Sequence, residues 1–236
     1  MPNIRITAFK WVPPFAQGLV RDLRVRWALE EAGLRYEEKL LGPGEQNSPE
    51  HRAAQPFGQV PVYEEDGLTL FESGAIVLHV GERCPALLPV DPARRARART
   101  WVLAALNSVE PHILNFTALD VFFANEEWAR LRRPSAEKMA QSRLDQLAAA
   151  LGSRDYLEGE FTAGDLVMTT VLRFLRDTDL VKNRHVLAAY QARCEARPTF
   201  QRALAAQLAH FAGNAPPVTA GAAPVKAAGA ALVKTA

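Results

Sequence analysis

Two short stretches in the first third of the chain carry the residue types of an anion-binding site. Glu72-Ser73 stands where a helix should begin, because apolar residues at helical spacing follow from Ile76. A serine at a helix start leaves its hydroxyl and several backbone N–H groups pointing out of the helix end, which favours an anion. Pro61 has no N–H and cannot continue a strand ladder. The backbone of Val60 is therefore expected to stay unpaired and to face the space that a ligand would occupy.

A strand, a hairpin turn and a returning strand join these two stretches. Val60 to Glu64 carries β-branched and aromatic residues and is predicted as a strand, with Leu68 to Phe71 as its return. Between them, Asp66-Gly67 is a hairpin signal, because a tight primed turn needs a positive φ that glycine adopts without steric cost. The sequence from Gln59 to Arg83 is therefore predicted as strand, hairpin, strand and helix.

This order of motifs, Gly-Gln-Val-Pro-Val, hairpin, Glu-Ser-Gly-Ala-Ile, resembles the glutathione-binding half of the cytosolic glutathione S-transferases, bacterial serine-type members among them. The resemblance implies a cis Pro61 and a Val60 backbone that pairs with the cysteinyl backbone of glutathione. It implies that Glu72 and Ser73 receive the γ-glutamyl carboxylate and amine. Gln59 stands where many relatives carry a lysine beside the glycyl end, and its amide lacks the charge-assisted part of that hydrogen bond.

The elements before this unit complete a first domain. The patterns predict a strand at Ile4–Ala8, a loop without regular structure at Lys10–Gly18, a helix at Val20–Ala32 ending at Gly33, a strand at Tyr36–Leu41 and a short helix after Ser48-Pro49. The order β-α-β-α-β-β-α is that of a thioredoxin-like domain, and one parallel crossover fits its first half.

After Cys84 the pattern changes to helices alone. Asp91-Pro92 is predicted as N-cap and first helical residue after a proline-containing linker. Helices are predicted over Ala93–Phe123, where Pro111 should kink or break the pattern, and over Ser135–Leu151, Thr162–Asp177, Arg184–Arg197 and Thr199–Ala212. The predicted fold class is α/β followed by all-α, the glutathione S-transferase fold, with a thioredoxin-like domain 1–83, a linker 84–92, an all-helical domain 93–212 and a flexible tail 213–236.

Thr162 and Asp165 have the spacing of a capping box at the start of one of these helices. The pattern predicts a structural role, so that Asp165→Ala should cost about 1 kcal/mol and leave ligand chemistry untouched. The same box opens the buried helix of the second domain in the family that the chain resembles, so it supports the family without naming a site.

The sequence names no single residue that would activate the glutathione thiol. A depression of about one pKa unit, ~1.4 kcal/mol, already matters for a thiol that titrates near 8.5. The Trp11–Phe15 loop resembles the Trp-x-Ser-Pro-Phe loop of serine-type members, in which the serine hydroxyl donates to the thiol. Pro13 takes the serine position here and offers neither hydroxyl nor N–H.

Three explanations stay open. Another donor can replace the hydroxyl, because a polar hydrogen or a nearby positive charge favours a thiolate; the candidates are Gln17, the Trp11 indole N–H, Lys10, Arg21 and Arg24. The backbone amides of the Ala16–Gly18 turn can suffice. Alternatively, the protein binds glutathione and conjugates poorly.

The electrophile is expected between the Trp11–Phe15 loop and the long helix after Ala93. The side chains placed to line its pocket are Phe15, Asn107, Phe116 and Phe123. The first hypothesis is an enzyme in which glutathione, as co-substrate, attacks a small hydrophobic electrophile without a metal; the resemblance implies a homodimer. The alternative is a non-catalytic protein of the same fold that binds glutathione or hydrophobic ligands. An isomerase or a thiol-dependent reductase is disfavoured, because the first loop has no cysteine.

Composition excludes several other classes. The 236 residues are 48% hydrophobic and 23% charged, with a formal net charge of +2, which is too balanced for a nucleic-acid-binding face. No run approaches the roughly 18 apolar residues of a membrane span, and the five histidines show no metal-ligand spacing. Cys84 and Cys194 lie far apart without a partner pattern, which favours free thiols in a reducing, cytoplasmic setting.

Overall fold

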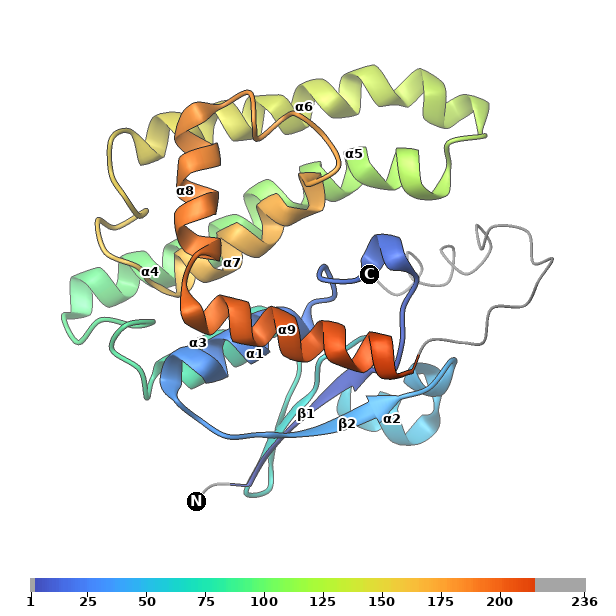
Figure 1. Cartoon of the computed structure of the whole chain (residues 1–236), viewed down its shortest axis with the longest axis vertical. Coiled ribbons are helices and arrows are strands. Elements are labelled where there is room, and N and C mark those ends of the chain that lie inside the picture. Colours follow the sequence, from blue (N-terminus) through green and yellow to red (C-terminus); the bar gives the residue numbers. More distant parts are fainter. Residues whose placement is uncertain (1–2, 215–236) are drawn as a thin grey trace.

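A four-stranded sheet lies at one end of the molecule (Figure 1). The computed structural model describes residues 3–214. Its strands are β1 (Ile4–Phe9), β2 (Glu37–Leu41), β3 (Tyr63–Glu65) and β4 (Leu68–Leu70), in the order β2-β1-β3-β4. β1 runs parallel to β2 and antiparallel to β3, and β4 is antiparallel to β3. This mixed sheet confirms the predicted thioredoxin-like arrangement.

Three helices complete the first half: α1 (Asp22–Ala32), α2 (Pro49–Ala54) and α3 (Ser73–Gly81). The order β-α-β-α-β-β-α is confirmed. α1 ends where the sequence predicts, because Gly33 adopts the left-handed φ of 64° that side chains resist. α1 and α3 lie between the sheet and the helices of the second half, and both contact α7 of that half (Figure 1).

Two predictions near the candidate site were wrong in detail. β3 begins at Tyr63, three residues later than predicted, because Pro61 cannot donate to a ladder. Val62 instead pairs with Thr7, whose N–H donates to the Val62 carbonyl (2.9 Å) and whose hydroxyl accepts from the Val62 N–H (2.6 Å). The loop predicted without regular structure contains a 3₁₀ turn, Pro14–Ala16, whose first position suits a proline because an N–H there would have no partner.

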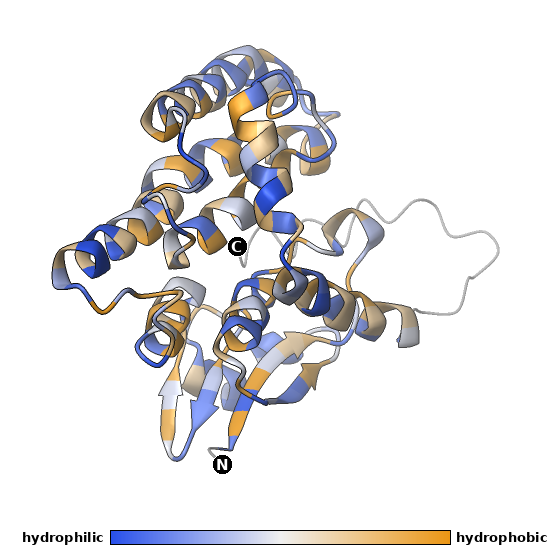
Figure 2. Ribbon diagram, turned by 60° about the vertical axis from the view of Figure 1, so that its left-hand side comes forward, coloured by the Kyte–Doolittle hydropathy of each residue, from blue (hydrophilic) through white to orange (hydrophobic). Residues whose placement is uncertain are grey.

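The second half is helical. Its helices are α4 (Pro92–Ala104), α5 (Glu110–Phe122), α6 (Glu127–Leu151), α7 (Ala163–Leu172), α8 (His185–Glu195) and α9 (Pro198–Gly213). As far as Asn214 this half contains helices and no strand, which confirms the predicted fold class. Figure 2 shows hydrophobic and hydrophilic residues alternating along the helices, as packing on one face and hydration on the other require.

The long helical pattern that begins at Ala93 breaks just before Pro111, as predicted. Residues Ala105–Val109 form a π-helical turn between α4 and α5. Pro111 lacks the N–H that would bond to the carbonyl four residues earlier, and its ring crowds the same carbonyl. The extra residue in the turn resets the rotational phase of α5 relative to α4, so the turn determines which α5 side chains face the first half.

α6 begins at Glu127, so the predicted helix start at Ser135 was wrong. Pro134 lies inside the helix. Ala129, one turn before it, is 2% exposed and packs in the core, as does Ala136 after it. Burial of this continuous face offsets the free-energy cost of the hydrogen bond that Pro134 cannot make. Helix propensity alone does not reveal that the helix continues through Pro134.

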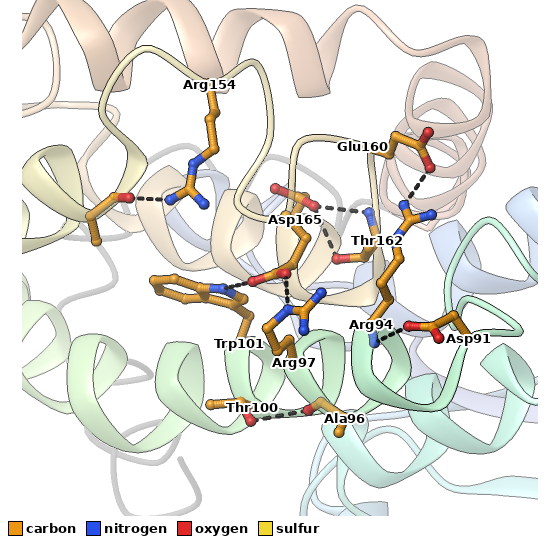
Figure 3. A network of polar contacts seen from close by, with 12 residues as sticks. Asp91, Arg94, Ala96, Arg97, Thr100, Trp101, Arg154, Glu160, Thr162 and Asp165 are labelled. Atoms are coloured by element: carbon orange, nitrogen blue, oxygen red, sulfur yellow. Dashed lines mark hydrogen bonds and ion pairs between the residues drawn. The ribbon is translucent and has the colours of Figure 1, made fainter.

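α7 is buried along its whole length and opens on the predicted capping box. The Thr162 hydroxyl accepts from Gly164 N–H (3.2 Å), and Asp165 accepts from Thr162 N–H (2.9 Å). Figure 3 shows this box beside polar contacts between α4 and the loop before α7, including the ion pair of Arg94 with Glu160. Trp101 Nε1 on α4 also donates to Glu158 of that loop (2.9 Å). The box and these contacts fix the start of the central helix.

A buried carboxylate joins the two halves. Glu31 on α1 accepts from Arg197 Nε (2.7 Å), from the Thr199 hydroxyl (2.6 Å) and from Trp27 Nε1 (3.0 Å). Burial alone would raise the pKa of Glu31, but the hydrogen bonds from Arg197 and Thr199 outweigh it, and the pKa lies below its ordinary value. The ionised form of Glu31 is therefore part of the contact between α1 and α9.

The predicted flexible tail lies outside the described residues beyond Asn214, and its first residue, Gly213, ends α9. Within residues 3–214, no helix combines the length and the apolar character needed to cross a membrane.

Candidate functional site

The Val60-Pro61 peptide bond is cis, as the resemblance implies. Val60 is 6% exposed. Within residues 3–214, neither the N–H nor the carbonyl of Val60 has a backbone partner, whereas the carbonyl of Gln59 bonds to His51 Nε2 (2.7 Å). The backbone of Val60 is thus available to a ligand, as the sequence predicts.

Ser73 is the first residue of α3 and Glu72 is its N-cap. Glu72 is exposed and has a φ of 68°, a strained conformation for a residue other than glycine. Ser73 is 4% exposed, and its hydroxyl oxygen accepts from Arg24 Nη1 (3.2 Å). Since a hydroxyl also carries one hydrogen, this contact leaves Ser73 able to donate to an anion at the helix N-terminus.

Arg24 connects Ser73 to both α5 and α7. Its guanidinium is 1% exposed, and donates to Thr170 Oγ1 (2.9 Å), to Ser73 and to Glu110 Oε1 (2.8 Å). Burial lowers the pKa of Arg24, and Glu110 opposes that shift. Burial alone would raise the pKa of Glu110, but Arg24 and Arg21 together hold it below its ordinary value. The two groups therefore form a buried, hydrogen-bonded ion pair, which offsets the cost of burying each charge.

Arg21 shares the same carboxylate oxygen. Its Nη2 lies 3.2 Å and its Nε 3.3 Å from Glu110 Oε1, and a quarter of its side chain is exposed (25%). One carboxylate thus faces two guanidinium groups, which leaves an excess of positive charge. Arg21 carries this excess to the wall of a cavity, where it favours an anion.

The cavity has a volume of about 450 Å³ and lies between the first loop and α5. Its first-half wall includes Phe9, Phe15, Ala16, Leu19, Val20, Arg21, Gln59 and Val60. Its second-half wall includes Pro111, Leu114, Asn115, Thr117, Ala118, Val121, Phe122, Phe174 and Asp177. Apolar side chains dominate both walls. Arg21, Gln59 and the Val60 backbone bring polar groups to the first-half wall, and Asn115, Thr117 and Asp177 bring polar groups to the other. Such a cavity suits a small hydrophobic molecule held beside a polar one.

The structure corrects the predicted pocket residues. Phe15 lies on the cavity wall and contacts Phe122 edge-on, with ring centroids 5.9 Å apart. Phe116 is 2% exposed and packs in the core under Arg133. Asn107 and Phe123, both in the described chain, do not line the cavity. Asn107 lies in the π-helical turn, and Phe123 packs against Trp128.

The missed α5 residues share one helical face. Leu114, Ala118 and Val121 recur at spacings of four and three and line the cavity, while Phe116 points to the opposite face. This spacing is visible in the sequence, but the phase of α5 depends on the turn before Pro111. Glu110 carries no sequence signal of its role, because its two arginine partners lie almost ninety residues away.

Among the five side chains considered for thiol activation, all of them in the described chain, Arg21 alone lines the cavity. The Gln17 amide donates back to the Val12 carbonyl (3.1 Å) of its own loop. Trp11 is half-buried outside the cavity lining, and Pro13 is buried. The positive charge of Arg21 is the candidate that geometry supports.

Residues 3–214 contain no group of three or more His, Cys, Asp or Glu side chains arranged to hold a metal ion.

Comparison with known proteins gives consistent matches over most of the chain. A family model described as the glutathione S-transferase N-terminal domain matches residues 16–82. Glutathione S-transferase F10 of Arabidopsis thaliana is 30% identical over 189 residues, 73% of this chain and 86% of that protein. Glutathione S-transferase 4 of Zea mays is 32% identical over 196 residues, 79% of this chain and 85% of that protein.

A solved structure extends the match to the fold. The theta class glutathione S-transferase from Xanthomonas axonopodis pv. citri, with glutathione bound, superposes with a TM-score of 0.72 at 27% identity. The superposition covers 86% of this chain and 98% of that chain. Both halves of the molecule, and therefore the cavity between them, belong to the matched region.

Proposed function

The chain belongs to the glutathione S-transferase family, and from this premise we propose that it transfers glutathione to a small hydrophobic electrophile. The observation that carries the proposal is the largely apolar cavity of about 450 Å³, with Arg21, Gln59 and Val60 at its first-half wall. A polar thiol nucleophile and an apolar electrophile can meet there.

Glutathione would bind through the first half. The unpaired backbone of Val60, next to cis Pro61, would pair with the cysteinyl backbone of the tripeptide. Ser73 would donate its free hydroxyl hydrogen to the γ-glutamyl carboxylate, with Glu72 on the amine. Gln59, on the cavity wall, would bond to the glycyl end without the charge that a lysine brings.

Arg21 would activate the thiol electrostatically. Its positive charge, shared with Arg24 against the single carboxylate of Glu110, favours the thiolate over the thiol. The thiol proton leaves to solvent. The sulfur lone pair then forms the carbon–sulfur bond, and the electron pair of the electrophile moves onto its leaving group or an adjacent carbonyl. Because Pro13 supplies no hydroxyl, positive charge takes the place of a hydrogen bond.

Assembly as a homodimer in the cytoplasm belongs to the same proposal. Phe57 (59% exposed) and Phe71 (37% exposed) contact each other edge-on with centroids 6.2 Å apart, an apolar patch that a second subunit would cover. Cys84 and Cys194 are buried free thiols, as expected in a reducing compartment. A sizing column tests the dimer.

A non-catalytic carrier remains the second candidate, and Pro13 favours it, because the position of the usual hydroxyl is filled by a buried proline. Such a protein would bind glutathione or a hydrophobic ligand in the same cavity.

One experiment separates these candidates. Glutathione binding is measured by calorimetry, and turnover on a panel of electrophiles, for the wild type, for Ser73→Ala and for Ser142→Ala, an exposed serine on α6, as control. We expect turnover by the wild type, glutathione affinity about tenfold weaker in Ser73→Ala, equivalent to ~1.4 kcal/mol for one hydrogen bond to a charged group, and no change in the control. Glutathione binding without turnover would select the carrier, and absence of glutathione binding would remove both the transferase and a glutathione-binding carrier.

A further inference from the structure

Two arginines of the helical half hold the loop that borders the cavity. Arg176 Nη1 donates to the Gln17 carbonyl (2.6 Å), and its Nη2 donates to the Phe15 carbonyl (2.9 Å). Arg173 Nε donates to the Gly18 carbonyl (3.2 Å). Both arginines lie at the C-terminal end of α7, where a 3₁₀ turn, Arg173–Leu175, continues the helix. We name this pair the arginine clamp.

Each member of the arginine clamp is itself held in place. Arg173 is 12% exposed, pairs with Glu195 (3.0 Å) and lies over the Phe200 ring (5.1 Å to the centroid). Arg176 is 29% exposed and lies 3.6 Å from Asp177, a residue of the cavity wall. Arg173 is therefore held by the protein before it meets the loop, whereas Arg176 is held chiefly by the two loop carbonyls to which its planar guanidinium donates.

Gly18 allows the close approach. Its φ is +75°, and a Cβ atom there would lie 3.2 Å from both Arg173 Nη2 and Leu204 Cδ1. N–H and carbonyl of one trans peptide point in opposite directions, so the contact of Arg176 with the Gln17 carbonyl also sets the direction of the Gly18 N–H. The neighbouring N–H groups of Ala16 and Leu19 donate within the loop, to the carbonyls of Pro13 (2.9 Å) and Ala16 (3.0 Å), whereas the Gly18 N–H has no backbone partner within residues 3–214. The clamp thus determines the backbone geometry of a loop whose Phe15 and Ala16 form the cavity wall.

We propose that Arg176, supported by Arg173, is a positioning residue for the thiol: it sets, from the helical half, the loop geometry that keeps the glutathione sulfur in its ionised form. The inference rests on the proposed transferase function. It assigns thiol activation in part to a residue that touches neither glutathione nor the electrophile.

A purely structural role for Arg176 predicts a different result. The halves are also joined by α1 packing on α9, by Glu31 with Arg197, and by Glu30 with Arg202 (2.7 Å). Loss of Arg176 leaves these contacts intact, so the halves stay docked while the loop is released. The chemistry of the sulfur should therefore change more than glutathione affinity or global stability.

The test compares Arg176→Gln with Arg202→Gln, an exposed arginine that also joins the two halves but lies outside the cavity lining of the described chain. The thiolate absorbance of bound glutathione and kcat/KM are both followed against pH. In Arg176→Gln we expect half-ionisation of bound glutathione about one pH unit higher and activity near pH 7 about tenfold lower. Glutathione affinity should stay within about twofold, and Arg202→Gln should match the wild type.

A conservative variant completes the design. Arg176→Lys keeps the charge and one donor for one carbonyl, so its pH profile should lie between those of wild type and Arg176→Gln; it also replaces Arg176→Gln if that variant does not fold. An Arg176→Gln profile that stays at the wild-type pH would overturn the inference and leave the transferase intact, and the Arg176→Lys profile decides in the same way if Arg176→Gln does not fold. A wild type that binds glutathione without ionising it would remove the proposed function and this inference together.

Discussion

At the scale of residues, the candidate site depends on one carboxylate, Glu110, that accepts hydrogen bonds from two arginines. Glu110 neutralises Arg24, which is buried under Ser73, and leaves Arg21 on the cavity wall with positive charge to spare. A fully buried Arg24 without Glu110 would be an unpaired charge, which proteins avoid at a cost of several kcal/mol. The same contact that keeps the fold intact therefore also creates the electrostatic asymmetry that the proposed chemistry needs.

This asymmetry predicts the effect of Arg21→Gln. The variant removes the positive charge at the cavity and leaves the Arg24–Glu110 pair, so the thiol of bound glutathione should ionise at higher pH. We expect kcat/KM near pH 7 to fall about three- to tenfold, equivalent to ~0.7–1.4 kcal/mol, and Arg21→Lys to recover part of the loss.

The control is Arg130→Gln, an exposed arginine on α6. Measured pH profiles of conjugation decide the matter: an Arg21→Gln profile that coincides with the wild type would exclude Arg21 from thiol activation and return attention to the backbone amides of the loop.

At the scale of elements, the phase of α5 and the start of α7 determine the second-half wall and its support. The π-helical turn before Pro111 sets which α5 residues face the cavity. The capping box at Thr162 fixes the start of α7, and Asp165 does more there than cap a helix. It also accepts from Leu157 N–H (2.8 Å) and from the Tyr190 hydroxyl (3.0 Å).

Asp165→Ala should therefore cost more than an ordinary cap. Beyond the ~1 kcal/mol of a lost cap, it leaves two buried donors unpaired, at about 1–3 kcal/mol each, so we expect a loss of about 3 kcal/mol or more. Urea unfolding measures it. Asp91→Ala, an exposed N-cap on α4 that accepts from Arg94 N–H (2.8 Å), is the matched control and should lose about 1 kcal/mol. Equal losses in the two variants would contradict the added role of Asp165.

At the scale of the whole molecule, the site exists because two halves meet. The cavity takes one wall from each half, and Glu31 locks α1 to α9 through Arg197 and Thr199. The pKa of Glu31 is depressed by those partners despite its burial. The stabilisation is therefore fully present above the unfolded-state value, near 4.3, and is lost as the pH falls through the lower folded value.

Glu31→Gln is the corresponding prediction. At pH 7 we expect it to lower the free energy of unfolding by about 1–2 kcal/mol, since a charged acceptor of several hydrogen bonds is replaced by a neutral one. The difference from the wild type should shrink as the pH falls below about 4. Glu30→Gln removes the neighbouring, more exposed pair with Arg202 and should lose less than about 1 kcal/mol. A Glu31→Gln deficit that stays constant down to pH 2 would contradict the depressed pKa.

The sequence by itself determined the fold class, most helices and the local structure of the candidate glutathione-binding stretch. Val60-Pro61, the Asp66-Gly67 turn and Glu72-Ser73 lie within one short stretch, so local rules predict the missing donor, the turn and the helix start there. The helix end at Gly33 and the Thr162 capping box were predictable for the same reason.

Only the tertiary structure decided which residues of the second half face the candidate glutathione-binding stretch. The Arg21–Glu110 and Arg176–Gln17 contacts join residues from different halves, and whether Phe116 or Leu114 faces the cavity follows from the helical phase after the turn at Ala105–Val109. Periodicity reveals that a helix has a buried face but not which partner buries it, because that choice depends on the packing of the whole chain.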